Sequence, residues 1–529
     1  MTLRNSTFNG CVTAIDQIWD WSWTYSGLVV NGCQTGINMS SGGVSDQAVG
    51  SVTIFDSSFT NTPTGIITAY DANASPKAAG SLILENVQLS NVQTAVQGPN
   101  GVCLAGGSTT ISAWGEGHAY TPSGPDQFES AFTANIRPSA LTTDDKFYTR
   151  SKPQYEGQPL SSFLSARDSG AKGDGLNDDT QALQAAINTA AAQDKIFYLD
   201  HGNYKVTDTI TIPAGAKIVG ETYSVILASG DNFSKIDSPL PVLKIGKVGE
   251  TGSVEMSDVI VATQGATAGA ILIEYNLASP TGSPSGLWDV HTRIGGFTGS
   301  NMQVAQCAKN PSSTAINSQC VAAFISMHVT TASTGLYMEN NWFWTADHDI
   351  DDPALGQIDI YTGRGLLIES SGPVWMYGHA VEHHSLYQYQ LSNARNVFGG
   401  MIQTETAYYQ PNPAAPAPYA SNEMCDDPVF SGSNTQGWGL RIVNSTDVLL
   451  YGAGLYSFFQ NWDTTCSSPT GTTTCQQQIF SLEGAVGGVS VYNLNTVRTA
   501  EMVVRDGQVV ARAKDNANSY SDTIARLIT

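Results

Sequence analysis

The sequence predicts an all-β protein made of two tandem right-handed parallel β-helices, the first of them incomplete. Composition and internal repeats support this prediction. Glycine is abundant, at 52 of 529 residues, while charged residues make up only 13%, which is typical of many short strands joined by turns. Segments that recur every 20 to 50 residues indicate stacked structural units. Because these units hold only short β-rich stretches between Asn, Gly and Thr turns, coils of a β-helix are favoured.

Residues 1–137 carry the clearest repeat and are interpreted as the remnant of the first β-helix. The segment FNGCVTAI, which begins at Phe8, recurs in altered form at Val30, Phe59 and Leu89, with offsets of 22, 29 and 30 residues. Equivalent residues are therefore expected to stack in columns, with neighbouring strands about 4.8 Å apart. Beyond about residue 100 the pattern disappears.

Between the first two repeats, the segment WDWSWTY (residues 19–25) alternates aromatic and polar residues. In a strand, alternate side chains point to opposite faces, so the tryptophans and Tyr25 share one face, while Asp20, Ser22 and Thr24 share the other. We expect most of the aromatic rings to pack in the core. The polar face could line a groove.

Residues 138–165 are polar and punctuated by prolines, without periodicity, and predict a linker across a surface. Residues 166–529 predict the second β-helix, with a capping helix and a C-terminal tail. The helix is indicated by a capping-box-like start at Asp178 and an apolar stripe over 182–190. Such a helix would cover the open edge of the first coil.

The second β-helix has its own repeats. The sharpest one aligns Val374 with Val397 at a 23-residue offset, and the same offset aligns Glu382 with Glu405. A coil of that length would place the two glutamates on neighbouring rungs.

Two further repeats are weaker. The segment GLYME at Gly335 recurs 30 residues on as GLLIE at Gly365. The segment at Asn393 recurs 51 residues on at Asn444, and this longer offset is interpreted as two coils.

Glu382 and Glu405 are the main candidates for chemistry. Hydrolysis of a glycosidic bond requires one acid to protonate the leaving oxygen and a second group to attack or to activate water. Two adjacent carboxylates repel each other, which raises the pKa of one of them. The alternative is that both are solvated or paired with cations. Lysine is absent from 374–410 and Arg395 is the only arginine there, but neighbouring histidines such as His383 keep the alternative open.

The segment from Asp347 to Asp352 is rich in acidic residues, but it has no glycine at the sixth position of a calcium loop. A solvated turn or a lobe of a cleft is therefore expected. Trp342 and Trp344 share one side of a strand, either in the core or with one ring against a sugar. The histidines show no metal-binding spacing, so neither a metal site nor a cofactor is predicted.

Net charge and hydropathy exclude several partner classes. A net charge of −22 with only 24 basic residues argues against nucleic acid and against a polyanionic sugar, so a neutral polymer fits better. No apolar run is long enough to span a bilayer. Among eight cysteines, Cys307 with Cys320 and Cys466 with Cys475 flank short loops, so each pair is either a local disulfide or a set of buried thiols.

Five segments resemble known families. GAKGDGLNDDTQALQAAI (170–187) is similar to the opening of pectate-lyase-like β-helix modules. WTADHDIDD (344–352), GPVWMYGHAVEHHSLYQYQL (372–391), QTETAYYQPNPAAPAP (403–418) and YGAGLYSFFQNW (451–462) resemble the family 55 glycoside hydrolases. Those proteins are mainly fungal exo-β-1,3-glucanases built from two β-helices side by side.

The resemblance implies an inverting enzyme that releases glucose from the non-reducing end of β-1,3-glucan. Glu405 would be the general acid and Glu382 would hold the nucleophilic water, with polar help from Ser22 or Thr24. It further implies a secreted monomer that acts on a neutral β-glucan and requires no cofactor. The substrate contacts expected are Trp342, Trp344, Tyr387, Gln403, Tyr408 and Tyr409.

The N-terminus departs from the family pattern. The chain begins inside a rung, without an opening module like 167–221 and without a signal peptide. It is therefore expected to be truncated, and we hypothesise that it folds poorly or is inactive, because an uncapped solenoid exposes an edge. Two other functions stay open: a different polysaccharide-cleaving β-helix, such as a pectin lyase or polygalacturonase, and a non-catalytic glycan-binding β-helix with no need of the glutamate pair.

Overall fold

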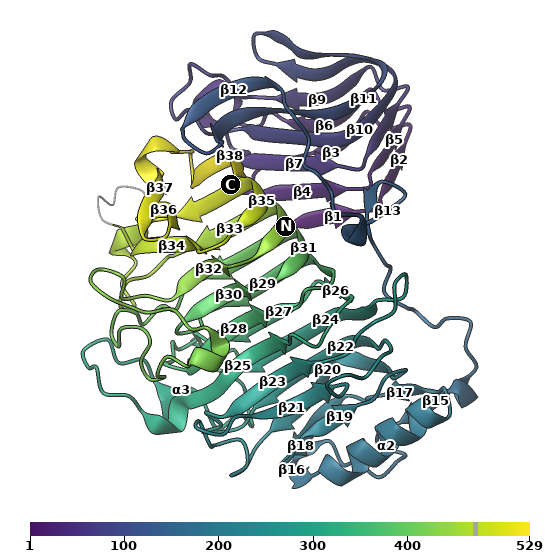
Figure 1. The fold of residues 1–529 in the computed structure, drawn as a ribbon, viewed down its shortest axis with the longest axis vertical. Coiled ribbons are helices and arrows are strands. Elements are labelled where there is room, and N and C mark those ends of the chain that lie inside the picture. The colour runs from purple at the N-terminus through teal and green to yellow at the C-terminus, as the bar shows by residue number, and fades with distance from the viewer. Residues whose placement is uncertain (469–473) are drawn as a thin grey trace.

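The computed structural model describes residues 1–468 and 474–529. Short strands pair in parallel, coil upon coil, in two stacks that are seen together in Figure 1. We refer to β1–β12 as the N-terminal stack and to β15–β38 as the C-terminal stack. The prediction of a parallel β-helix fold is confirmed, whereas the division into separate domains stays a prediction.

The N-terminal stack contains one short helix, α1 (Gly43–Asp46). Its strands are β1 (Thr2–Arg4), β2 (Thr7–Asn9), β3 (Thr13–Asp16), β4 (Trp23–Ser26), β5 (Val29–Asn31), β6 (Thr35–Met39), β7 (Ser51–Phe55), β8 (Ser58–Thr60), β9 (Thr64–Thr68), β10 (Ser81–Gly98), β11 (Gly101–Tyr120) and β12 (Asp126–Ala131).

The repeat in this stack sets its register as predicted. Phe8 pairs with Val30, Val30 with Phe59, and Phe59 with Leu89. Val30, Phe59 and Leu89 are buried and belong to the core of the stack. Each repeat therefore contributes one rung of a continuous apolar column, which is why it recurs in the sequence.

Beyond residue 100 the chain still forms strands. β11 returns antiparallel along β10, and β12 pairs antiparallel with β11. A returning strand places its residues across from the preceding strand rather than above the equivalent residue of an earlier coil. The repeat is therefore absent although the pairing continues.

The C-terminal stack also contains α2 (Thr180–Ala192) and α3 (Val304–Cys307). Its strands are β15 (Phe163–Ser165), β16 (Asp174–Asp178), β17 (Ile196–Tyr198), β18 (Gly202–Val206), β19 (Ile210–Ile212), β20 (Lys217–Ala228), β21 (Leu240–Ile245), β22 (Glu255–Thr263), β23 (Ala270–Tyr275), β24 (Ser285–Ile294), β25 (Val321–Val329), β26 (Leu336–Glu339), β27 (Trp342–Thr345), β28 (Tyr361–Ile368), β29 (Val374–Glu382), β30 (Tyr387–Ser392), β31 (Arg395–Glu405), β32 (Trp438–Val443), β33 (Thr446–Tyr456), β34 (Gln476–Glu483), β35 (Gly487–Val497), β36 (Thr499–Arg505), β37 (Gln508–Arg512) and β38 (Asp522–Ile528).

Helix α2 forms where the sequence predicts it and lies at the lower end of the stack in Figure 1. Its buried side chains are those of Leu183, Ala186, Ile187 and Ala190. They belong to the core of the C-terminal stack, so the helix covers the apolar end of the first coils.

The 23-residue repeat also gives the register as predicted, because Val374 pairs with Val397 and Glu382 with Glu405. The interpretation of the 51-residue offset as two coils is wrong. Val397 pairs directly with Val448, so the offset spans a single coil. That coil is long because it contains the loop over 411–436.

The repeat between Gly335 and Gly365 does not describe neighbouring rungs. Leu336 pairs with Val374, while Leu366 pairs with Tyr389 in the other large sheet. The two segments look alike because both are apolar strands that face the same core, not because they occupy one column.

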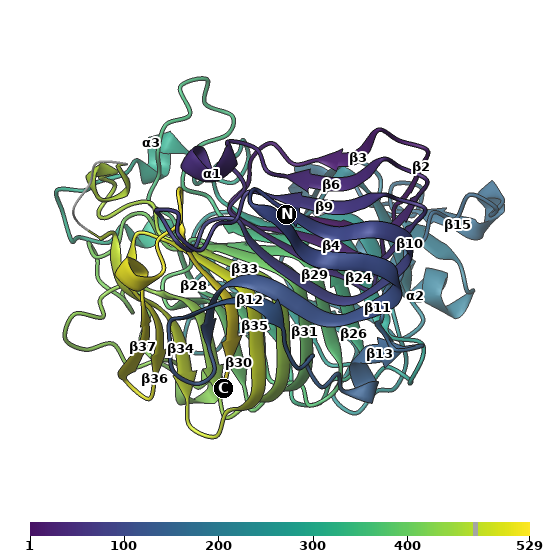
Figure 2. The ribbon, with the colours of Figure 1, turned by 90° about the horizontal axis from the view of Figure 1, so that it is seen from above.

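The two stacks meet along a surface rich in aromatic residues. Figure 2 shows the strands of the N-terminal stack lying across those of the C-terminal stack. Glu85 accepts hydrogen bonds from the hydroxyls of Tyr451, at 2.5 Å, and Tyr492, at 2.8 Å. Leu141 and Phe147, from the expected surface linker, are buried here, and Phe147 stacks on Phe398 with ring centroids 3.9 Å apart. This segment therefore forms part of the contact between the stacks.

Two disulfides join Cys307 to Cys320 and Cys466 to Cys475, as one of the two readings of these cysteines predicted. Within the described residues, no helix is long and apolar enough to cross a membrane.

Candidate active site

Glu382 and Glu405 are the last residues of β29 and β31, two neighbouring parallel strands. They lie directly opposite each other in the pairing. Because both strands end at the same edge, both carboxyls are presented where the chain leaves the sheet. Glu382 is 7% exposed, and the Glu405 side chain is 20% exposed.

Two side chains hold the Glu382 carboxylate. Trp342 Nε1–H donates to Oε2 at 2.8 Å, and Gln403 Nε2 donates to Oε1 at 3.0 Å. Burial and the neighbouring charge of Glu405 nevertheless raise the pKa of Glu382 to about 7. The pair therefore retains one proton up to near-neutral pH.

Glu405 has a different set of partners. The Tyr408 hydroxyl donates to Glu405 Oε2, and His383 Nε2 lies 3.6 Å from the same oxygen. His383 Nδ1–H donates to the Thr345 carbonyl at 2.9 Å, and Asp347 Oδ1 lies 3.8 Å from Nδ1. This geometry places His383 between two carboxylates.

Burial by itself would lower the pKa of His383. Glu405 and Asp347 outweigh that effect and raise the pKa to about 9. His383 is therefore a buried cation at neutral pH. The alternative that the glutamates pair with a cation therefore holds for Glu405, which His383 contacts. Glu382 has no such partner among the described residues and can still take up a proton.

Aromatic rings surround the pair. Trp342 is 40% exposed and stacks on Trp344, which is buried, with centroids 5.1 Å apart. Of the two tryptophans, Trp342 is therefore the one that a sugar could contact. Tyr408 packs on Phe459, with centroids 3.9 Å apart, and on the His383 ring.

The N-terminal stack reaches this site through the WDWSWTY segment. The Trp21 ring lies 4.9 Å from that of Tyr456, and Tyr456 is the register neighbour of Glu405 on β33. Thr24 Oγ1–H donates to the Tyr451 carbonyl at 2.7 Å, so this hydroxyl is already engaged. Ser22 lies between these two contacts, is buried, and its hydroxyl has no partner within residues 1–468 and 474–529.

The two faces of that segment follow the prediction in part, because Tyr25 lies in the core of the N-terminal stack and Trp23 packs against that core. The polar residues Asp20, Ser22 and Thr24 are buried, while Trp19 is 48% exposed. Thr24 is buried against the C-terminal stack, where its hydroxyl donates to the Tyr451 carbonyl. Asp20 is buried within the N-terminal stack, where its carboxylate accepts from the backbone N–H groups of Gly50 and Ser51.

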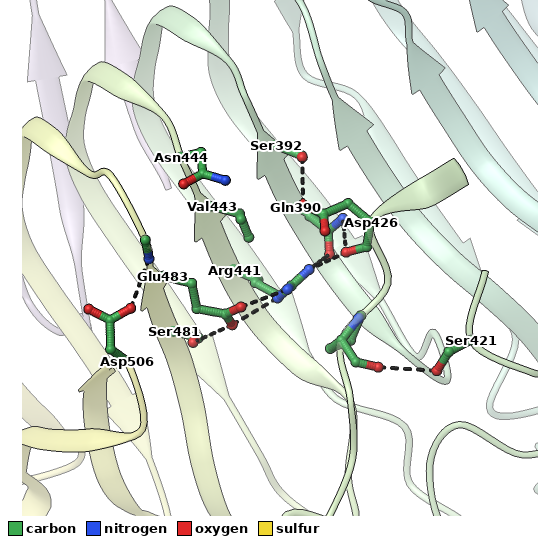
Figure 3. A network of polar contacts seen from close by, with 12 residues as sticks. Gln390, Ser392, Ser421, Asp426, Arg441, Val443, Asn444, Ser481, Glu483 and Asp506 are labelled. Atoms are coloured by element: carbon green, nitrogen blue, oxygen red, sulfur yellow. Dashed lines mark hydrogen bonds and ion pairs between the residues drawn. The ribbon is translucent and has the colours of Figure 1, made fainter. Parts of the chain in front are cut away.

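Two of the expected substrate contacts lie away from the glutamates. Tyr409 is buried, and its hydroxyl bonds the Ser385 hydroxyl at 2.6 Å. Tyr387 is fully buried and pairs with Trp438 in the other sheet. Figure 3 shows the neighbouring polar network there, in which Arg441 binds both oxygens of Glu483. Neither tyrosine is accessible to a ligand in this arrangement.

A pocket of about 980 Å³ adjoins the site on the side of Tyr408. Trp462, whose ring lies 5.9 Å from that of Tyr408, is part of its wall. The other lining residues are Lys309, Pro311, Pro411, Asn412, Gln460, Asn461, Asp463, Thr464, Thr465 and Cys466. The pocket is built by the long loops around the strand ends, and its size suits a ligand of several rings.

Asp347 and Tyr456 were not among the predicted site residues. Asp347 lies in the acidic segment that was interpreted as a solvated turn or a lobe of a cleft, and its contact with His383 favours the second alternative. Tyr456 lies 51 residues after Glu405, and that offset is the one that relates Val397 to Val448. Had the offset been interpreted as a single coil, it would have placed Tyr456 beside Glu405.

Two relatives identify the family. A glucan 1,3-beta-glucosidase from Cochliobolus carbonum is 48% identical over 532 residues, covering 99% of this chain and 67% of that protein. A protein from Arthroderma benhamiae, named a probable glucan endo-1,3-beta-glucosidase, is 38% identical over 99% of this chain and 70% of its own length. The chain belongs to family 55 of the glycoside hydrolases.

Two other comparisons concern the fold of this family 55 chain. A model described as rhamnogalacturonase A/epimerase, pectate lyase-like, matches residues 1–38 and 163–238. A solved structure of a variant of sacteLam55A from Streptomyces sp. SirexAA-E, in complex with glucose, aligns with a TM-score of 0.41 at 14% identity. It covers 99% of the family 55 chain and 91% of the bacterial one.

Proposed function

We propose that this family 55 chain hydrolyses β-1,3-glucan by exo-acting, inverting cleavage that releases glucose from the non-reducing end. The observation that carries the proposal is the glutamate pair, which holds one proton between two carboxyls with separate hydrogen-bond partners. Hydrolysis of a glycoside requires such a pair, one group protonated and the other ionised.

In the proposed reaction, Glu405 protonates the glycosidic oxygen while the bond from that oxygen to C1 breaks. Glu382 accepts a proton from the water whose oxygen forms the new bond to C1. Both oxygens of Glu382 accept hydrogen bonds from fixed donors, which fixes the orientation of this carboxyl. Because the raised pKa belongs to Glu382 in the free protein, the proposal requires the single proton of the pair to lie on Glu405 once the glycosidic oxygen is bound. Glu405 Oε1 has no hydrogen-bond partner within the described part of the chain, which leaves it available for the transferable proton.

Several features favour a neutral glucan. The net charge of −22 would repel a polyanion, and the exposed Trp342 ring offers a flat apolar surface for a pyranose. Ser22 is proposed to help position the water, because its buried hydroxyl has no other partner among the described residues. The names of the two relatives refer to β-1,3-linked glucan.

The roles are tested with two substrates, laminarin and an aryl β-glucoside with an acidic leaving group such as dinitrophenol. The activated leaving group departs without protonation. Glu405→Gln should therefore lose activity on laminarin and keep it on the aryl glucoside, whereas Glu382→Gln should lose both. Glu423→Gln, which changes an exposed glutamate outside the site, is the control. The opposite pattern would reverse the two roles, and full activity of both variants would contradict the proposal.

The mode of attack is tested on the products. Exo cleavage should give glucose as the only early product from laminarin, and inversion should give it first as the α-anomer, which NMR detects. A ladder of oligosaccharides at early times would indicate endo cleavage instead, the activity in the name of the Arthroderma relative.

We also propose that the protein acts outside the cell as a monomer without a cofactor. Its two disulfides suit an oxidising compartment. Sedimentation at the mass of one chain and undiminished activity after dialysis against a chelator are the expected results.

A further inference from the structure

A second pair of glutamates lies in the N-terminal stack, outside the candidate active site. Glu116 on β11 pairs directly with Glu129 on β12, its antiparallel neighbour. Cys103, near the start of β11, lies beside them, because β11 turns around the coil. The Cys103 sulfur and one carboxylate oxygen from each glutamate all lie within 4.8 Å of one another.

Glu116 is fully buried, and neither of its carboxylate oxygens has a hydrogen-bond partner in the described ranges 1–468 and 474–529. Within the same ranges, no ion pair links Glu116 or Glu129 to a lysine, arginine or histidine. A buried carboxylate without a charged partner costs several kcal/mol, and burial accordingly raises the pKa of the Glu116 carboxyl to about 8. The carboxylate of Glu483, unlike that of Glu116, has an ionic partner, because Arg441 donates hydrogen bonds to both of its oxygens (Figure 3).

We propose that Cys103, Glu116 and Glu129 bind one divalent transition-metal ion, with Zn²⁺ the best match. A thiolate and two carboxylates are ligands that Zn²⁺ accepts, with tetrahedral geometry and a fourth position for water. Mg²⁺ and Ca²⁺ prefer oxygen ligands alone, so the sulfur argues against them. The ion would be the cationic partner that neither glutamate has among the described residues.

The position of the cluster indicates a structural role. Glu129 is exposed, so an ion can enter from solvent. Three residues after Glu116, Ala119 pairs with Arg526 of β38, which belongs to the C-terminal stack. The ion would therefore connect β11 and β12 close to the place where the two stacks meet.

The test is uptake of Zn²⁺ and Co²⁺ by chelator-dialysed protein. We expect one Zn²⁺ per chain and, with Co²⁺, the near-ultraviolet charge-transfer band of a thiolate ligand. Cys103→Ser should abolish that band, and Glu129→Gln should weaken Zn²⁺ binding at least tenfold. Cys425→Ser, which changes a buried free cysteine elsewhere, is the matched control and should keep both signals.

A further variant tests whether the positions of the three ligands matter, and not only their presence in the sequence. A Cβ at Gly98 would lie 2.5 Å from the Cys103 sulfur, so Gly98→Ala should displace the sulfur and weaken Zn²⁺ binding while all three ligands remain. Glu129→Gln changes an exposed side chain, so it should fold as the parent does. Absence of metal uptake by the parent would overturn the proposal, as would stoichiometric binding that survives Cys103→Ser and Glu129→Gln.

Discussion

Glu382 with Glu405 and Glu116 with Glu129 are two versions of the same arrangement, a pair of glutamates directly opposite each other on neighbouring strands. In each pair one carboxyl is buried and the other is more exposed. The pairs differ in what surrounds them. Trp342, Gln403, Tyr408 and His383 serve the first pair, whereas the second has no hydrogen-bond donor to Glu116 among the described residues.

The difference teaches that a pair of opposed carboxylates does not by itself define a function. Where donors and a cationic histidine from several elements converge, repulsion within the pair yields one transferable proton and one fixed acceptor. Where a thiol lies beside the pair and no lysine, arginine or histidine pairs with it among the described residues, a metal ion is the best counter-charge.

The largest effect is expected from the same substitution in the two pairs. Glu405→Gln should lower kcat on laminarin by about 10²–10⁴-fold, the range for loss of a general acid. Glu116→Gln should leave kcat within about twofold, because it changes a metal ligand rather than a group near the substrate. Steady-state kinetics on both variants checks the contrast, which fails if the two respond alike.

Loss of one donor should have a smaller effect. Trp342→Phe keeps an aromatic surface but removes the hydrogen bond to Glu382. A hydrogen bond to a charged group is worth about 1.5–3 kcal/mol, so kcat/KM should fall by about 10- to 100-fold. The KM for laminarin should change little because the ring remains. A large rise in KM with unchanged kcat would instead assign Trp342 to substrate binding alone.

The pH dependence follows from the raised pKa of Glu382, which is about 7. Above that pH the pair loses its last proton, so kcat/KM should fall about tenfold per pH unit. Glu382 binds its proton more tightly in the folded protein than in the unfolded chain between about pH 4.5 and 7, so its own contribution to the unfolding free energy should decrease by about 3 kcal/mol over this window. Other buried groups also titrate there, among them His379 and His384, whose pKa values are lowered to about 3, so the Glu382 contribution is the difference between the parent and Glu382→Gln.

Urea unfolding at several pH values measures the slope of the unfolding free energy against pH, and Glu382→Gln should make this slope more positive between about pH 4.5 and 7. A parent and a Glu382→Gln variant with the same slope over this window would contradict the assigned protonation. Glu423→Gln is again the control, because an exposed glutamate should not affect the slope.

The smallest effect concerns stability in the second pair. In chelator-treated protein at about pH 9, above the pKa of Glu116, which burial raises to about 8, Glu129→Gln removes one of two opposed charges and should raise the unfolding free energy by about 0.5–1 kcal/mol. With Zn²⁺ present, the same variant should be less stable than the parent because it binds the ion more weakly. Urea unfolding with and without Zn²⁺ checks the change of sign, and an identical difference in both conditions would argue against a metal.

Much of the fold could be predicted because equivalent residues of successive coils recur in the sequence at an offset equal to the coil length, and this offset gives the strand register. The columns through Phe8, Val30 and Phe59 and the pairing of Glu382 with Glu405 follow from offsets alone. The apolar stripe of α2 likewise identified the capping helix. Interpretation failed where the coil length changed, as with the 51-residue offset, and where strands return antiparallel, as with β11.

The sequence by itself determined the coil architecture, the glutamate pair and the family, because repeats and local motifs depend on neighbouring rungs. Only the tertiary structure decided what surrounds each pair. The buried cation at His383 and the approach of Trp21 to Tyr456 join residues from different coils or different stacks. The meeting of Cys103 with Glu116 and Glu129 depends on how β11 turns and how β12 returns along it. Such contacts depend on how loops fold and how the stacks pack together, and neither produces a repeating pattern in the sequence.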